Sequence, residues 1–328
     1  MNMSLQAHSP CDPEFRFLSV LFAELKSQGV EFAVMRNHEH LPFSAGGSDL
    51  DIIVATEDGK VAKTAVLKSV FLAGGAPIGI VETVGFFKVY ALGRSGDESC
   101  QWWGLRVDVN LGLFFRGHRL LKENALLPIR WHRDIPILAD ELQGVLGVLK
   151  EVCNNGIFPT RYSKLAQLAL PEWSTIKVLL APMGERALCL LKVMISSGTS
   201  EQVSGRDCQK IRWAISHEAV SGRAWSSLSD RVRFEWSKLN RYLRPSGIVV
   251  AILGVDGSGK SSIIDSMLPA LNAATHNGVV IKHLRPAVLP PLARLKGTAG
   301  VPDAPVLNPQ GATPSGKIGS LVRLVYLT

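Results

Sequence analysis

One segment near the end of the chain, GVDGSGKSS, constrains the fold more strongly than any other, because it fills the pattern G-x-x-x-x-G-K-[ST]. Its glycines let the backbone turn tightly and direct successive N–H groups toward phosphate oxygens. Lys260 supplies a positive charge for the outer phosphates and is the predicted catalytic group, and the Ser261 hydroxyl suits a Mg²⁺ ion. The predicted nucleotide-binding residues are Gly254, Val255, Asp256, Gly257, Ser258, Gly259, Lys260, Ser261 and Ser262.

The flanks of this loop favour a strand–loop–helix unit. An apolar run at 247–253 precedes the loop and is predicted to be a strand, and a helical pattern follows from residue 261. The N-terminus of such a helix attracts anions. Only one more strand, at 278–283, is predicted after residue 246. A complete nucleoside-phosphate kinase sheet has five parallel strands, so we expect a partial domain that lacks full kinase activity by itself.

A second informative stretch is GGSDLDIIV, between residues 46 and 54. Asp49 and Asp51 lie two apart on a predicted strand, so both carboxylates point to one side of it. A third carboxylate, Asp108, lies on the polar face of the alternating strand predicted at 105–111. If these strands are neighbours, the three aspartates form a Mg²⁺ site of the kind that phosphoryl and nucleotidyl transfer require. Structural roles remain open, because Asp49 could end a turn and Asp108 could pair with Arg106.

The spacing of apolar residues divides the chain into three predicted domains. Residues 1–136 alternate helical and strand patterns and predict a mixed α/β domain. Residues 137–245 contain long helical periodicities separated by glycine and proline, which predict a helical middle domain. Residues 246–328 contain the phosphate loop and a Gly/Pro-rich stretch, with a helical pattern returning at 318–326. The fold class expected is therefore α/β with a helical insertion between two α/β parts.

Charge and composition limit the partners and the compartment. The net charge is +8, and the basic excess falls after residue 136, which suits nucleotide phosphates, acidic sugars or an anionic surface. No interleaved basic–aromatic motif favours nucleic acid. The five scattered cysteines contain no C-x-x-C pair, which is typical of a reducing compartment. There is no signal peptide and no apolar run of the length that a membrane span needs. We expect a cytoplasmic protein.

Residues 30–115 resemble the nucleotidyltransferase superfamily, which has a G-S…D-x-D strand and a later third aspartate. The segment VMRNHEHLPFSAGGSDLDIIV is similar in particular to nucleotidyltransferase-like domains found with bacterial surface-polysaccharide genes. The resemblance implies catalytic, metal-binding roles for Asp49, Asp51 and Asp108, and contact with a polysaccharide-assembly complex. The superfamily has a Gly-Ser pair upstream that holds triphosphate. This chain has Met35-Arg36-Asn37 there, so Arg36 is a candidate replacement.

The segment ILGVDGSGKSS resembles the thymidylate kinases, whose loop has the form G-x-D-G-x-G-K-[ST]. That resemblance implies that Asp256 contacts the sugar of an acceptor monophosphate. It extends from residue 248 to about residue 283, with an LRP echo at 284–286. The Asp-Arg motif and the arginine-bearing lid of the family are missing from the rest of the sequence. We therefore expect a C-terminally truncated fusion of the two domain types.

Three functions are compatible with the sequence. The first is an ATP- and Mg²⁺-binding phosphotransferase of the thymidylate-kinase type, acting on a nucleoside monophosphate or related acceptor. The second is a Mg²⁺-dependent nucleotidyltransferase that uses the three aspartates, with a regulatory phosphate loop. The third is a non-catalytic, nucleotide-responsive scaffold in surface-polysaccharide synthesis. The first two make the protein a transferase.

Overall fold

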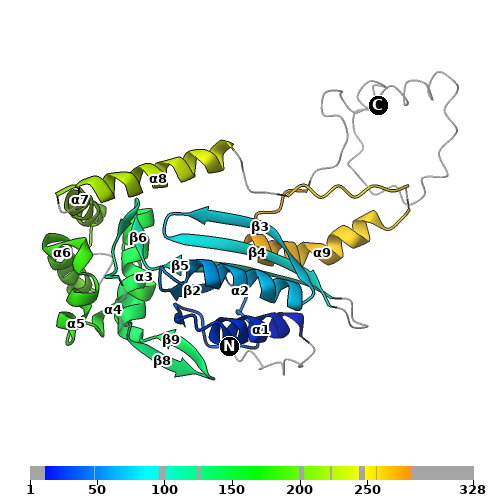
Figure 1. Cartoon of the computed structure of the whole chain (residues 1–328), viewed down its shortest axis with the longest axis horizontal. Helices are drawn as coiled ribbons and strands as arrows, with labels where there is room; N and C mark the ends of the chain where they lie inside the picture. Colours follow the sequence, from blue (N-terminus) through cyan, green and yellow to red (C-terminus); the bar gives the residue numbers. More distant parts are fainter. Residues whose placement is uncertain are drawn as a thin grey trace, which may run out of the picture. The chain divides into compact units, whose positions relative to one another are not determined.

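The computed structural model describes residues 12–47, 49–95, 101–123, 127–198, 203–221, 224–243, 248–255 and 257–281 (Figure 1). The chain divides into two units, residues 1–279 and 280–328, and the described part falls almost entirely in the first. Within it the fold is α/β, as the sequence predicted. The helix predicted at 318–326 lies outside the described residues. No helix among the described residues combines the length and the apolar character that crossing a membrane would require.

A mixed seven-stranded sheet organises the first unit, with the strand order β3-β4-β5-β2-β1-β9-β8. Two of its neighbouring pairs are parallel, β2 with β5 and β1 with β9, and the other pairs are antiparallel. A separate two-stranded hairpin follows β5. The strands are β1 (Phe32–Val34), β2 (Leu50–Val54), β3 (Gly75–Thr83), β4 (Phe86–Arg94), β5 (Trp102–Leu111), β6 (Phe114–Phe115), β7 (His118–Arg119), β8 (Ile129–His132) and β9 (Ile135–Leu138).

Two helices cover one face of the sheet, α1 (Pro13–Ser27) and α2 (Gly59–Leu72). The Asp12 side chain caps α1 by accepting a hydrogen bond from the Glu14 N–H at 2.9 Å. Alternate residues of the central strands, such as Ile52 and Val107, are fully buried in one apolar cluster with the two helices. This face carries apolar side chains only at every second strand position, so the intervening positions point to the opposite face.

The opposite face of the sheet contributes Ala33, Met35 and Ile53 to a second apolar cluster, shared with the helices that follow β9. Gly144 permits a close crossing of α3 and α4, because a Cβ there would lie 2.2 Å from the Ala166 nitrogen. A helical region between 137 and 245 agrees with the sequence prediction. Its helices are α3 (Asp140–Asn155), α4 (Thr160–Gln167), α5 (Trp173–Leu179), the 3₁₀ turn Ala181–Met183, α6 (Glu185–Ser197), α7 (Gly205–Ser221) and α8 (Ala224–Leu243).

The prediction of a strand at 247–253 was wrong for the residues that the structure describes. Residues 248–253 form no strand, and the Val249 side chain is 97% exposed. Likewise, residues 278–281, at the start of the second predicted strand, are not in a strand. An extended segment becomes a strand only when its N–H and C=O groups pair with a neighbour. The apolar run at 248–253 has no such neighbour in the described part of the chain.

Helix α9 (Lys260–Thr275) follows the phosphate loop and packs on β5 and β4. The contact is close: a Cβ on Gly104 of β5 would lie 2.0 Å from the Ala270 carbonyl oxygen. Gly104 is an even number of positions from Asp108, so α9 lies on the same face of the sheet as the Asp108 side chain. The helix of the phosphate loop is thus seated on the strand that carries one of the predicted metal ligands.

Candidate metal centre

Strand β2 places two carboxylates on one face of the sheet. Leu50 and Ile52 belong to the apolar cluster under α1 and α2, so Asp49 and Asp51 point to the other face. Asp51 is fully buried, and Asp49 is 6% exposed. Both carboxylates are therefore buried on the same face of the sheet, as the alternation of the sequence predicted.

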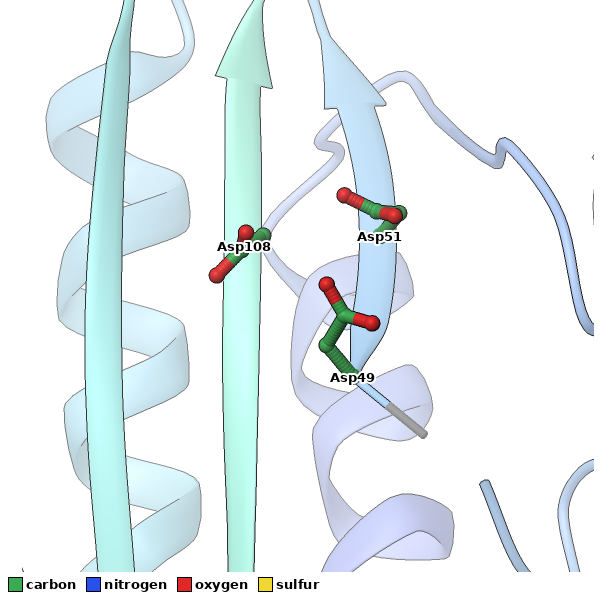
Figure 2. A group of neighbouring side chains, drawn as sticks. All are labelled: Asp49, Asp51 and Asp108. Atoms are coloured by element: carbon green, nitrogen blue, oxygen red, sulfur yellow. The ribbon is translucent and has the colours of Figure 1, made fainter. Parts of the chain in front are cut away.

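Strand β5 adds the third carboxylate through the register of the sheet. In the parallel pair of β2 and β5, Asp51 lies directly opposite Asp108. Figure 2 shows the three aspartate side chains side by side on these two strands. One carboxylate oxygen from each of Asp49, Asp51 and Asp108 lies within 4.8 Å of the others. The structure thus brings together the three residues that the sequence singled out.

Two arginines bind the carboxylates from within the α/β part. Arg36, which follows β1, donates from Nε to Asp51 and pairs with Asp49 at 3.2 Å. Arg106 of β5 donates to Asp49, and its Nε lies 3.1 Å from Oδ1 of Asp108. Arg36, the candidate replacement for a triphosphate-binding motif, is thus engaged with the carboxylates in this structure.

Two lysines complete the charged cluster from outside the aspartate-bearing strands. Lys88 of β4 is the register partner of Asp108 and donates to it at 2.6 Å. Lys150 of α3 donates to Asp51 at 3.2 Å. Four cationic side chains therefore surround three carboxylates, and the carboxylates are electrostatically compensated in this arrangement. A metal ion that entered would have to displace part of this cationic set.

The carboxylates have pKa values shifted in opposite directions. For Asp49, burial acts to raise the pKa, but the hydrogen bond from Arg106 and the charge of Arg36 outweigh it, so the pKa lies well below the ordinary value. For Asp108, burial is again the largest influence, and here it exceeds the effect of Lys88 and Arg106, so the pKa is raised. The site therefore contains one firmly ionised carboxylate and one that is poised to accept a proton or a cation.

The donor set suits a hard divalent cation. Carboxylate oxygens are the ligands that Mg²⁺ and Mn²⁺ prefer, and three of them converge here from a rigid sheet. Oδ1 of Asp108 is buried and receives no hydrogen bond, although it lies near Arg106. An acceptor of this kind is where a cation gains most. The residues that would hold the ion are Asp49, Asp51 and Asp108.

The phosphate loop has part of the geometry that its sequence predicted. Gly257 and Gly259 adopt positive φ angles of 83° and 78°, which glycine tolerates without strain. The Lys260 ammonium donates to the carbonyl oxygens of Gly254 at 2.8 Å and of Val255 at 2.6 Å, folding back over the loop. The Ser258 N–H also donates to Val255.

The start of α9 determines the positions of the last two residues of the predicted loop. Helix α9 starts at Lys260, so Ser261 and Ser262 lie in its exposed first turn, where free N–H groups occur. Asp256 lies outside the described residues. The described loop residues thus lead directly into α9, without the flanking strand that was predicted.

Sequence reasoning did not find Lys88 and Lys150 as members of the carboxylate cluster. Lys88 could have been suggested by the alternation of β4, which places it on the polar face. Nothing in the periodicity of α3 indicates that Lys150 meets Asp51, because that contact depends on how the helix crosses the sheet. His118 of β7 lies 2.8 Å from the Pro182 carbonyl oxygen.

Comparisons with family models, with curated proteins and with solved structures each found no match to this chain.

Proposed function

We propose that the three aspartates form a divalent-cation centre for metal-dependent transfer of a nucleotidyl group. The observation that carries this proposal is the convergence of Asp49, Asp51 and Asp108, buried and within 4.8 Å, on neighbouring strands of one sheet. Three like charges are rarely buried together unless cations share them. Mg²⁺ bound there would neutralise phosphate oxygens and polarise the phosphorus they surround.

The residues of the chain have distinct parts in this proposal. Asp49, Asp51 and Asp108 would hold the cation, and Asp49 stays ionised because of Arg106 and Arg36. Released from the carboxylates by the cation, the same arginines and lysines would compensate phosphate charge. The transferred group would move from a nucleoside triphosphate to an acceptor hydroxyl, with pyrophosphate as the leaving group and the hydroxyl proton passing to a base or to solvent.

Calorimetric titration of the 328-residue chain with Mn²⁺ tests the proposed metal centre. Wild type should bind Mn²⁺, and Asp49→Asn/Asp51→Asn should not, because it removes two of the three charged ligands while keeping their shape. Asp265→Asn, on the exposed surface of α9, is the control and should bind as wild type does. Identical Mn²⁺ binding by wild type and the double variant would refute the metal centre. Incubation with each α-labelled nucleoside triphosphate then tests for nucleotidyl products.

A second candidate function is ATP-dependent phosphotransfer at the phosphate loop, and the loop geometry favours it. The positive φ angles of Gly257 and Gly259 and the start of α9 at Lys260 support phosphate binding there. In this proposal ATP and Mg²⁺ bind at the loop, with Ser261 as a metal ligand, and a small molecule accepts the phosphoryl group. Titration with a fluorescent ATP analogue tests it, since Lys260→Ala should weaken binding while Lys164→Ala, on the exposed surface of α4, should not.

If the protein binds nucleotide but forms no product from it, the non-catalytic scaffold function is favoured. A nucleotide-responsive protein in a cytoplasmic polysaccharide-assembly complex would bind ATP at the loop and yield neither nucleotidyl nor phosphoryl products. The two product analyses described above separate it from both enzymatic proposals.

A further inference from the structure

A cavity of about 430 Å³ lies beside Asp108, between the sheet and the helical region. Its walls come from β4, β5, the residues 112–116 that follow β5, and helices α3, α7 and α8. A volume of this size accommodates a small organic ligand. Among the described residues that line it, Asp108 is the one carboxylate, and the cations are Lys88, Arg116, Lys150, Arg212, Lys238 and Arg241.

These cations differ in how far carboxylates compensate their charge. Lys238 pairs with Glu235 at 3.5 Å, and both side chains are about half exposed. Within the described part of the chain, no carboxylate pairs with Arg212 or Arg241. The Arg212 guanidinium instead lies 5.8 Å from the centre of the Phe115 ring, and the Lys238 ammonium lies 4.4 Å from that of Phe234. Cations held over aromatic rings and facing a common cavity provide charge for an anion and a flat apolar surface beside it.

Lys88 and Lys150 connect this cavity to the carboxylates. Each lines the cavity, and each also donates to an aspartate, Lys88 to Asp108 and Lys150 to Asp51. Both side chains are about one third exposed or less, at 26% and 32%. A lysine ammonium on a flexible stem can turn from one anion to another nearby. An anion in the cavity would therefore draw the lysines away from the aspartates and leave the carboxylates freer to bind a cation.

We propose that this cavity binds a phosphate-bearing organic ligand, and that Lys88 and Lys150 couple its binding positively to that of a divalent cation at the three aspartates. The anion site rests on the cavity alone, whereas the coupling rests on the proposed metal centre. By linkage, each ligand raises the affinity for the other by the same factor. The ligand class is a phosphate ester with a flat ring, because cations and phenylalanine rings share the walls.

The anion site is tested by titrating the full chain with phenyl phosphate at low ionic strength. Lys238→Gln/Arg241→Gln removes two exposed cavity charges and should weaken binding about tenfold or more, as loss of charge-assisted contacts does. Arg231→Gln/Arg233→Gln makes the same charge change on the same helix outside the cavity and should bind as wild type does.

The opposite results overturn the anion site. Equal affinity of wild type and Lys238→Gln/Arg241→Gln, or no saturable binding by wild type, would each do so. Phenol in place of phenyl phosphate should bind much more weakly, and equal binding of the two would refute the anion chemistry.

The coupling is tested by Mn²⁺ titration with and without saturating phenyl phosphate, corrected for Mn²⁺ bound by phenyl phosphate alone. Mn²⁺ affinity should rise several-fold with phenyl phosphate in wild type. In Lys150→Met it should already be higher and should respond less. An unchanged Mn²⁺ affinity in wild type overturns the coupling. If phenyl phosphate binds in the cavity but Mn²⁺ does not bind at all, the metal centre and the coupling fail while the anion site stands.

Discussion

Lys150 of helix α3 donates a hydrogen bond to Asp51 of strand β2 at 3.2 Å, so a helix of the middle region directly contacts the carboxylate cluster. This ammonium competes with any cation that approaches Asp51. Replacing it should therefore change metal binding as well as packing.

Lys150→Met should bind Mn²⁺ more tightly than wild type, by a few-fold to about tenfold, because one competing positive charge is removed. Methionine retains most of the apolar stem of the lysine. Calorimetric titration measures the change. Lys164→Met, an exposed lysine of α4, is the matched control and should leave Mn²⁺ affinity unaltered. Weaker Mn²⁺ binding by Lys150→Met would mean that the lysine supports the metal rather than competing with it.

The stability of the protein should depend on pH through Asp49. Its pKa in the folded state lies below the ordinary value of 3.8, so the ionised carboxylate stabilises the fold at neutral pH. That contribution is present above the ordinary value and is lost progressively as the pH falls below it. In Asp49→Asn the free energy of unfolding should fall less over this range, as measured by urea titration at each pH.

Asp108→Asn should change the pH dependence of stability in the opposite direction. The pKa of Asp108 is raised in the folded state, so its ionisation costs stability as the pH rises above the ordinary value. Relative to wild type, Asp108→Asn should gain stability at neutral pH compared with acidic pH. Parallel pH profiles for wild type and both variants would contradict the assigned shifts.

Lys260→Ala should weaken binding of an ATP analogue roughly tenfold to a hundredfold, the equivalent of about 1.5–3 kcal/mol for one charge-assisted contact. The melting temperature without ligand should change little, because the Lys260 ammonium donates to loop carbonyl oxygens that are exposed to solvent. Fluorescence titration and thermal melts measure the two quantities. Equal affinities of the two proteins would show that the loop does not bind phosphate.

Gly104→Val should destabilise the first unit by about 1–3 kcal/mol, as overpacking does. The added side chain would collide with the backbone of α9 at Ala270. Hydrogen exchange should show loss of protection in α9 above that in α1. Gly205→Ala, where an added Cβ meets no neighbour within 4 Å, is the control and should not destabilise the protein. Unchanged protection of α9 in Gly104→Val would mean that the helix does not pack on β5.

Cys153 should resist alkylation in the folded protein. It is buried, and burial raises the pKa of its thiol to about 12, so the reactive thiolate is scarce at pH 8. Cys189 is exposed and should react with iodoacetamide far faster. Peptide mass spectrometry after timed labelling compares the two sites. Comparable rates for Cys153 and Cys189 would show that the cavity wall at Cys153 opens readily.

The aspartate cluster was predictable because two local rules determine it. Alternation places Asp49 and Asp51 on one face, and Asp108 occupies the equivalent phase of its own strand. The sequence did not show that β2 and β5 are neighbours, which is a question of topology. The cationic set around the aspartates depends on that topology and on the crossing of α3, so Lys150 gave no local signal.

The prediction of a strand at 247–253 was wrong because it depended on pairing with a second segment. The composition of this segment is typical of a buried parallel strand. The prediction depended on that composition alone, which does not specify the strands that would flank the segment. The side chains of Ile248, Val249, Val250 and Leu253 remain exposed, because strand pairing is a property of two segments together. The helix after the loop did not depend on such a partner, and α9 begins within one residue of its predicted start.

The register of β4, β5 and β2 places Lys88, Asp108 and Asp51 in one row across three strands. A shift of β5 by a single residue would turn Asp108 into the apolar cluster beneath α1 and α2, and would expose Val107 and Val109 on the opposite face. An unpaired carboxylate in that cluster would cost several kcal/mol. The charged row therefore makes a one-residue slip of β5 unfavourable, and this constraint on the register holds whether or not a ligand binds.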